Sequence, residues 1–395
     1  MILTRPDRNW SWVVMVASFV IHGLNGSILY GAGIIQIALL ERFNESVSLT
    51  SWAGGIFIFF MSSAGTGSGI IFTTGVVVVG LNFEKKRSLA TGFASCGAGV
   101  GVFILSPVIQ LAKEEYGNQG FFFIMAGIAL NMFVFGSLCF PSYLEYNQEE
   151  INLSDTNLSV SLLSLSTKKV IRERVQVFAN IPFILICLSL FSSHIGIYLM
   201  YVHLPNFSIS TGTPAFQASF LMSVTGIMNC ISRFLIGLVG NSENISNSIL
   251  YFGTFALLGL STMLFPYYGA SYTGQSIYAA FLGSYSGCCY VLLNTITPNL
   301  VGVNNLATAF GIEMVFTGVG TLIGPPLAGF ILDYGGTYEA SFTVAGSSAV
   351  IAAVLGLASE VFRKLNHTGD KNINPETDKL FKDHNSTTND NVTET

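Results

Sequence analysis

The sequence predicts an all-α, polytopic membrane protein, and three observations support this. Of its 395 residues, 51% are hydrophobic and only 10% are charged, with a mean hydropathy of +0.59, whereas soluble domains carry about 25% charged residues. The apolar residues form runs of the length that a helix needs to cross a bilayer, about 20 residues. Lys and Arg are concentrated in some of the segments between these apolar runs and are rare in the other segments. We therefore expect about ten transmembrane helices.

The first part of the chain predicts four spans. Trp10 and Trp12 begin the first one, where aromatic residues of an interfacial belt are found. The second run has no charge, but it is too long for one ordinary span and too short for two. The four predicted spans cover residues 10–40, 46–83, 88–111 and 120–140.

A polar, serine-containing segment over residues 141–177 predicts a linker, and six further spans follow it. Those six cover residues 178–202, 215–240, 247–268, 273–297, 306–332 and 338–361. The remaining tail is polar and rich in Asn and Thr, which predicts disorder. The expected domains are thus an N-terminal bundle over 1–140, the linker over 141–177, a six-helix bundle over 178–361, and a tail over 362–395.

The distribution of basic residues predicts the orientation in the membrane. If the N-terminus is inside, the inner segments hold 14 Lys and Arg and the outer loops hold 2, Arg42 and Lys113. Positive charge remains on the cytoplasmic side of membrane proteins. We therefore expect both termini and the linker to be cytoplasmic, and the protein to be a multi-pass protein of the plasma membrane.

A cluster of basic residues followed by small residues occurs in NFEKKRSLATGFASCGAGVG, residues 82–101. Basic residues suit an inner loop, and small residues at helical spacing let the next helix approach a neighbour closely. The stretch resembles the signature of the monocarboxylate transporter family of solute carriers, a branch of the major facilitator superfamily. The matching residues include Phe83, Lys85, Lys86, Arg87, Gly92, Gly97 and Gly101, while Asn82 replaces the leading aromatic residue.

A second signature of that family matches in part at the N-terminus. Asp7, Trp10 and Trp12 stand at its acidic and tryptophan positions, but its glycines are absent. The resemblance implies two bundles around a central cavity, with twelve helices as the norm in the family. Between the two signatures this chain lacks roughly fifty residues of the family pattern, including the third helix, so that residues 46–83 join the second helix to the fourth.

Arg233 is the first candidate for a binding residue. No other charge lies between Arg174 and Glu243, and an ionisable residue at membrane depth marks a functional site by default. Its fork of donors suits a carboxylate; the alternative is a side chain that reaches from the membrane to the interface. Glu313 is the second such charge, and it would pair with Arg233, take a proton, or lie near the cytoplasmic end of its helix.

The resemblance implies an Asp four residues before this arginine, involved in proton and substrate coupling, where this chain has Asn229. A lysine of proton-coupled members in the first helix is also missing, because no lysine lies between Arg8 and Lys85. The resemblance therefore supports an organic-acid carrier in general and weakens proton-linked lactate transport in particular. His194 is the remaining candidate for carrying a proton besides Glu313.

Three further features complete the candidate sites. Besides Arg233, the candidates for substrate binding are Asn229, Glu313, Asn25 and Tyr30, and Tyr198 and Tyr201 are candidates for lining the same cavity. Gly324, Pro325 and Pro326 are expected to break the predicted span over residues 306–332, because Pro removes a backbone donor, and to act as a gating hinge, not as a ligand site. The six cysteines lie in apolar segments, and no metal-ligand spacing occurs.

The expected function is secondary-active or facilitative transport of monocarboxylates or related small organic acids by alternating access. The expected partners are the organic anion, the lipid bilayer and, if transport is coupled to protons, protons. Nucleic acid, a cofactor and enzymatic activity are not expected. A second hypothesis is a truncated, non-transporting product that acts as a membrane partner or is inactive. The resemblance leaves open the substrate and the need for a single-span ancillary glycoprotein.

Overall fold

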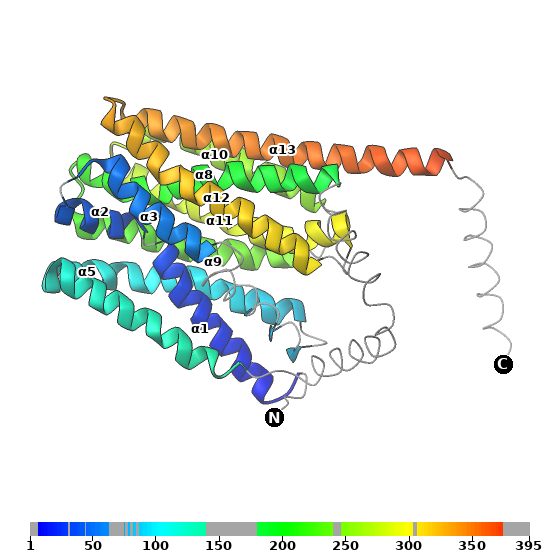
Figure 1. Cartoon of the computed structure of the whole chain (residues 1–395), viewed down its shortest axis with the longest axis horizontal. Helices are drawn as coiled ribbons and strands as arrows, with labels where there is room; N and C mark the ends of the chain where they lie inside the picture. Colours follow the sequence, from blue (N-terminus) through cyan, green and yellow to red (C-terminus); the bar gives the residue numbers. More distant parts are fainter. Residues whose placement is uncertain are drawn as a thin grey trace, which may run out of the picture.

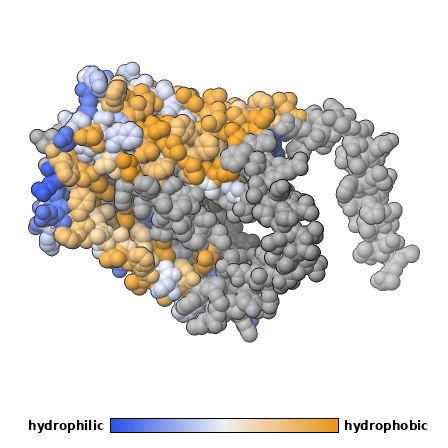
Figure 2. Space-filling view, viewed as in Figure 1, coloured by the Kyte–Doolittle hydropathy of each residue, from blue (hydrophilic) through white to orange (hydrophobic). Residues whose placement is uncertain are grey.

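The structure, a computed structural model, describes residues 7–30, 32–43, 45–62, 75, 78–79, 82–83, 87–139, 180–239, 246–302 and 306–373. These residues form helices and the turns between them, as the fold class predicts. Within the described residues, eight helices are long and apolar enough to cross a membrane. In Figure 2 the visible sides of the helices are mostly hydrophobic, and hydrophilic residues gather at one end of the molecule.

The N-terminal group of helices contains α1 (Trp10–Tyr30), α2 (Ala32–Phe43), α3 (Val47–Ser62) and α5 (Arg87–Gly136) (Figure 1). The predicted single helix over residues 10–40 is wrong, because α1 and α2 are separate helices with different neighbours. α1 packs mainly against α5, whereas α2 packs mainly against α8 (Ile181–Ser210). Most of the second half of the predicted 46–83 span lies outside the described residues.

Helix α5 is a hairpin of two helical segments that reverses at Gly117. Gly117 has φ 63°, ψ −175°, a conformation that glycine adopts without the steric cost of a Cβ atom. Ala90, near the start of α5, belongs to the same hydrophobic cluster as Val14 at the start of α1, and Cys139, just past the end of α5, packs against that cluster. The two segments therefore run in opposite directions, as the predicted spans at 88–111 and 120–140 require.

The second group contains α8, α9 (Ala215–Val239), α10 (Asn247–Tyr268), α11 (Tyr272–Val301), α12 (Leu306–Asp333) and α13 (Tyr338–Ile373). Their bounds follow the six spans predicted after the linker except at the ends of α8, at Ser210 instead of 202, and of α13, at Ile373 instead of 361. α8 begins at an Asn180 cap, whose side chain accepts a hydrogen bond from the Phe183 N–H, as N-caps do. α8 packs against α12 and α13, and α9 packs against α11, around a continuous apolar core.

Two predictions about this group are wrong. The Gly324–Pro325–Pro326 stretch does not break the helix, because α12 is helical from Leu306 to Asp333; it packs against α3 and α8, whose contacts hold it in place. α13 continues past the predicted boundary at 361 into the tail. Arg363 and Lys364 both pair with Glu360, at 2.7 Å and 3.6 Å, and such pairs one turn apart stabilise a helix. The linker and the tail beyond 373 lie outside the described residues.

Candidate functional site

Helix α9 places Arg233 in the interior of the protein. Its side chain is only 3% exposed, so it does not reach out to the membrane surface. Asn229 lies one helical turn earlier on the same face, and the Arg233 Nε donates a hydrogen bond of 2.8 Å to the Asn229 Oδ1 atom. This bond fixes the plane of the guanidinium group.

Tyr290 of α11 holds the guanidinium from a second side. The Arg233 Cζ atom lies 5.7 Å from the centre of the Tyr290 ring, within the range of a cation–π interaction. The Tyr290 hydroxyl in turn lies 2.9 Å from the His194 Nε2 atom of α8. The His194 Nδ1 atom is 2.9 Å from the Leu190 carbonyl oxygen. His194 is thus a part of the arginine's surroundings, with one ring nitrogen on a tyrosine and the other on the backbone.

A second chain of polar contacts supports Asn229. Its Nδ2 atom donates to the Ser286 Oγ atom of α11 at 3.4 Å, and the Tyr201 hydroxyl of α8 lies 2.9 Å from the same Ser286 oxygen. The amide of Asn229 therefore uses its oxygen on Arg233 and its nitrogen on Ser286. Three helices of the second group, α8, α9 and α11, contribute to this arginine cluster: Arg233, Asn229, Tyr290, Ser286, His194 and Tyr201.

The guanidinium retains a donor without a partner. The Arg233 Nη1 atom is buried and makes no hydrogen bond in the described part of the chain. No carboxylate of the described residues forms an ion pair with Arg233. A buried charge is costly unless it is paired and hydrogen-bonded. Chemically, the cluster offers an oriented, buried cation with free donor capacity, which suits an anionic group with two oxygens.

Glu313 is not part of this cluster, so the structure does not show the predicted pairing with Arg233. It is fully buried in α12, and its Oε1 atom accepts a hydrogen bond of 2.6 Å from the Thr297 hydroxyl of α11. The nearby core contains Ala309 of α12 together with Phe183 and Cys187 of α8. Glu313 thus lies near the first residues of α8 and α12, and its role stays a prediction.

The other candidates of the first span lie on α1. Asn25 is 5% exposed, and its Oδ1 atom accepts no hydrogen bond within the residues that the structure describes. Tyr30 is the last residue of α1, and its side chain lies outside the description. A role for either residue in binding stays a prediction.

The two family signatures contact each other. The Asp7 N–H donates to the Asn82 carbonyl oxygen at 3.0 Å, and the rings of Trp12 and Phe83 pack edge to face with their centres 5.3 Å apart. Trp10 donates from its indole nitrogen to the Leu138 carbonyl oxygen, at 3.2 Å. Lys85 and Lys86 lie outside the described residues, as does the side chain of Arg87, with which α5 begins.

The glycines of the second signature differ in their surroundings. A Cβ atom on Gly97 would meet the Phe19 carbonyl group of α1, and one on Gly101 would meet the backbone of Gly23. Gly92 has nothing within 4 Å of such an atom. The close approach predicted for the small residues therefore occurs between α5 and α1, through Gly97 and Gly101.

The N-terminal group meets the second group through α5 and α9, and through α3 and α12. At the first contact Gly99 lies against Gly226, so that a Cβ on Gly99 would lie 2.5 Å from the Gly226 oxygen. The Cys96 thiol nearby donates to the Cys230 carbonyl oxygen at 3.7 Å. Gly226 and Cys230 lie about two turns and one turn of α9 before Arg233. The arginine cluster therefore lies beside the junction of the two groups.

At the second contact Asp333, the last residue of α12, caps the first turn of α3. Its two carboxylate oxygens accept hydrogen bonds from the N–H groups of Val47, at 3.1 Å, and Ser48, at 2.8 Å. A carboxylate is favoured there because the first N–H groups of a helix lack partners within it. About two turns of α12 before Asp333, Pro326 lies against Gly55 of α3 and Gly324 lies against Ile195 of α8.

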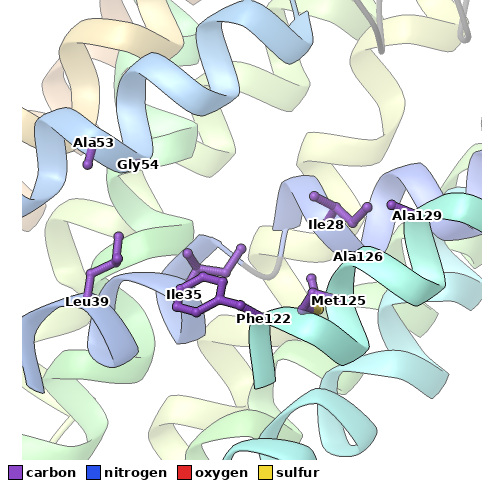
Figure 3. Close-up of a pocket in the computed structure, with 9 residues that line it drawn as sticks. All are labelled: Ile28, Ile35, Leu39, Ala53, Gly54, Phe122, Met125, Ala126 and Ala129. Atoms are coloured by element: carbon purple, nitrogen blue, oxygen red, sulfur yellow. The ribbon is translucent and has the colours of Figure 1, made fainter. Parts of the chain in front are cut away.

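A separate cavity of about 340 Å³ lies between the helices of the N-terminal group. Figure 3 shows the side chains that surround it, which are all apolar. They are Ile28 of α1, Ile35 and Leu39 of α2, Ala53 and Gly54 of α3, and Phe122, Met125, Ala126 and Ala129 of α5. This cavity has no donor for an anion and is therefore a poor candidate for the same site.

Sequence reasoning did not single out Tyr290 and Ser286. Both lie in an uncharged apolar run, and their only signal is a spacing of four residues, which places them on one face of α11. Tyr198 and Tyr201 of α8, in contrast, are candidates from the sequence, and the Tyr198 ring stacks on His194 with centres 6.2 Å apart. Tyr290 and Ser286 become recognisable only beside a charge on another helix.

Comparison with known proteins gives a family and a set of relatives. The family model of the Major Facilitator Superfamily matches residues 26–312 and 242–387. Monocarboxylate transporter 3 of Gallus gallus is 26% identical over 444 residues, covering 94% of this chain and 81% of that protein. Monocarboxylate transporter 12 of Homo sapiens is 26% identical, covering 92% and 83%. The resemblance predicted from residues 82–101 is thereby confirmed.

Solved structures share the fold at low sequence identity. The crystal structure of a D-xylose–proton symporter has a TM-score of 0.62 at 13% identity, covering 88% of this chain and 97% of that one. The partially occluded inward-open form of the xylose transporter XylE from E. coli has a TM-score of 0.60 at 13% identity, covering 87% and 96%. At this identity the likeness concerns the fold alone, and it confirms the predicted two-bundle architecture of the all-α chain.

Proposed function

Because the chain belongs to the Major Facilitator Superfamily and is a multi-pass membrane transporter, we propose that it carries a monocarboxylate or a related small organic anion by alternating access. The single observation that carries the substrate class is the buried Arg233 with its unpaired Nη1 donor. A carboxylate that binds there supplies the missing negative charge. Its oxygens accept hydrogen bonds from the free N–H groups of the guanidinium.

The arginine cluster supports small substrates of this kind. Asn229 and Tyr290 hold Arg233 in one orientation, and an arginine oriented in advance loses less conformational entropy when it binds. The names of the relatives, monocarboxylate transporters 3, 9 and 12, fit this chemistry. The position of the cluster beside the α5–α9 junction fits a site that opens to alternate sides as two bundles move.

The remaining parts of the proposal rest on the sequence. The excess of Lys and Arg in the predicted inner segments supports an orientation with both termini in the cytoplasm, and the membrane that we propose is the plasma membrane. The division into bundles at residues 1–140 and 178–361 belongs to the same proposal. The absence of a polar catalytic cluster in the sequence supports transport without enzymatic activity.

Uptake of a labelled panel of short monocarboxylates and aromatic amino acids tests the substrate class. Cells express this chain, Arg233→Ala, Arg233→Lys or Arg363→Ala at matched surface levels. Loss of a buried charge partner costs about 2 kcal/mol or more, so we expect kcat/KM of Arg233→Ala to fall at least roughly 30-fold. Arg233→Lys should recover only part of this loss, because a lysine cannot form the bidentate contact.

Arg363→Ala is the matched control, since Arg363 pairs with Glu360 near the end of α13 and should leave uptake unchanged. Saturable uptake that survives Arg233→Ala would contradict the assignment of the site to Arg233. A wild-type chain that reaches the surface and takes up no member of the panel would contradict the substrate class.

One observation favours a second candidate, a non-transporting membrane partner. The match to the Gallus gallus transporter extends over 444 residues, more than the 395 of the whole chain. Within the matched region, the relative therefore has residues that have no counterpart in this chain. A missing helix would remove one wall of the N-terminal bundle. In that case the chain should reach the membrane and transport nothing, and restoring a family segment between Ser62 and Phe83 should restore uptake.

A further inference from the structure

A carboxyl group lies in the interior of the second group of helices without a cation to balance it. Glu313 is fully buried. Thr297 donates one hydrogen bond of 2.6 Å to its Oε1 atom, and its Oε2 atom is buried without a partner in the described part of the chain. A single neutral hydroxyl does not compensate for the loss of water around an ionised carboxylate.

The helices around Glu313 provide no positive charge. The titratable groups that face it are Cys187 of α8, Tyr251 of α10 and Cys289 of α11, and these are ordinarily neutral at pH 7. No Lys, Arg or His of the described residues forms an ion pair with it. In this environment the neutral acid is the favoured form.

A polar path leads from Glu313 toward the arginine cluster. Thr317 lies one turn further along α12 on the same face, and its hydroxyl is also buried without a partner in the residues described. Gly320 follows and lies against the Cβ atom of His194. His194 contacts the Tyr290 hydroxyl at 2.9 Å, and the Tyr290 ring packs on Arg233. One unpaired hydroxyl, that of Thr317, therefore stands between the carboxyl group and the residues around Arg233.

We propose that Glu313 is the proton-binding residue of the transport cycle and carries a proton at neutral pH. Asn229, beside Arg233, has no titratable group and cannot release or bind a proton, whereas the carboxyl group of Glu313 can. When the Glu313 side opens to water, its O–H bond breaks, the proton passes to water, and a carboxylate remains; on the other side water returns a proton. This inference rests on the proposed transport of an organic anion and makes the transported pair, one anion and one proton, neutral.

Infrared spectroscopy of the purified full-length protein tests the protonated state without any substrate. A protonated carboxyl group has a carbonyl stretching band that an ionised one lacks. We expect this band at neutral pH to lose intensity in Glu313→Gln and to remain in Glu339→Gln, a matched control at an exposed position of α13. An unchanged band in Glu313→Gln would overturn the proposal.

Proteoliposomes test the coupling, with radiolabelled pyruvate as the probe. An inward proton gradient of about one pH unit permits up to about tenfold accumulation in a one-to-one symport. Glu313→Gln should lose this accumulation and retain exchange of internal for external pyruvate within about twofold, because glutamine mimics the neutral acid. Full accumulation by Glu313→Gln would overturn the proposal. A wild-type protein that moves no pyruvate would contradict the proposed function for this probe, and the infrared result would then decide on Glu313 independently.

Discussion

At the scale of single residues, the direction of the Arg233 side chain depends on Asn229. The Nε atom of Arg233 donates to the Asn229 oxygen at 2.8 Å, and the free Nη1 atom is oriented as a consequence. Removing the acceptor leaves a buried donor unsatisfied, at a cost of about 1–3 kcal/mol. We expect Asn229→Ala to raise KM for the anion about 5- to 100-fold with a smaller change in kcat, as measured by initial uptake rates.

Ser219 supplies the control for this variant, because its hydroxyl bonds only to the preceding turn of α9, at 2.7 Å from the Phe216 oxygen. Ser219→Ala should leave KM unchanged. If Asn229→Ala binds the anion as the wild type does, the arginine is oriented by Tyr290 alone and the role given to Asn229 is wrong.

What sequence reasoning could find at this scale is the charge, and what it could not find is the surroundings. Arg233 and Glu313 stand out as isolated charges in apolar runs. Their pairing with each other was a natural expectation, but the structure gives Arg233 an asparagine and a tyrosine and gives Glu313 a threonine. These partners come from α9 and α11, and an uncharged tyrosine or threonine in an apolar helix has no distinguishing pattern.

At the scale of helices, the crossing of α5 and α1 depends on the absence of side chains at two glycines. A Cβ atom at Gly101 would meet the Gly23 backbone, whereas one at Gly92 would meet nothing within 4 Å. We expect Gly101→Ala to destabilise the protein by about 1–3 kcal/mol, as overpacking does. Gly92→Ala should be neutral or stabilising by up to about 1 kcal/mol, because alanine favours the helix. The apparent Tm in detergent measures both.

Equal Tm values for the two alanine variants would show that α5 can move away from α1 without cost. The close packing of this signature would then have no structural role.

Helix boundaries could be predicted where the hydrophobic runs alone determine them. The starts of the six spans after the linker agree with those of α8 to α13 within about three residues, because polar turns separate the apolar runs, as between Tyr268 and Tyr272. The predictions failed where packing decides: α1 and α2 divide one apolar run because each has its own neighbour, and α12 remains helical through Pro325 and Pro326 between α3 and α8. A single sequence does not reveal these neighbours.

At the scale of the whole molecule, Asp333 joins the two groups of helices at one end. Its carboxylate accepts from Val47 and Ser48 at the start of α3, and these bonds have to break when α3 and α12 separate. A helix cap is worth about 0.5–2 kcal/mol, so Asp333→Ala should increase the fraction of molecules open at this end about 2- to 30-fold. Distances between spin labels at Glu45 and Glu339 measure that fraction.

Glu115→Ala is the comparison for this experiment, because it removes an exposed carboxylate near the reversal of α5 that caps no neighbouring helix. It should leave the distance distribution unchanged. If Asp333→Ala also leaves the distance distribution unchanged, water satisfies the N–H groups of Val47 and Ser48 without a cost in free energy, and the role given to Asp333 is wrong.

In the proposed alternating-access cycle, the crossing of Gly99 and Gly226 is the place where α5 would slide over α9. Backbone lies on backbone at these two glycines, beside the Cβ atoms of Cys230 and Val102, so a small shift at this point requires few side chains to change rotamer. Interlocked side chains resist such sliding because protein interiors are densely packed. The activation barrier for switching should then arise mainly from the hydrogen bonds at the helix ends, and the rate of turnover should depend more on Asp333 than on the residues of this crossing.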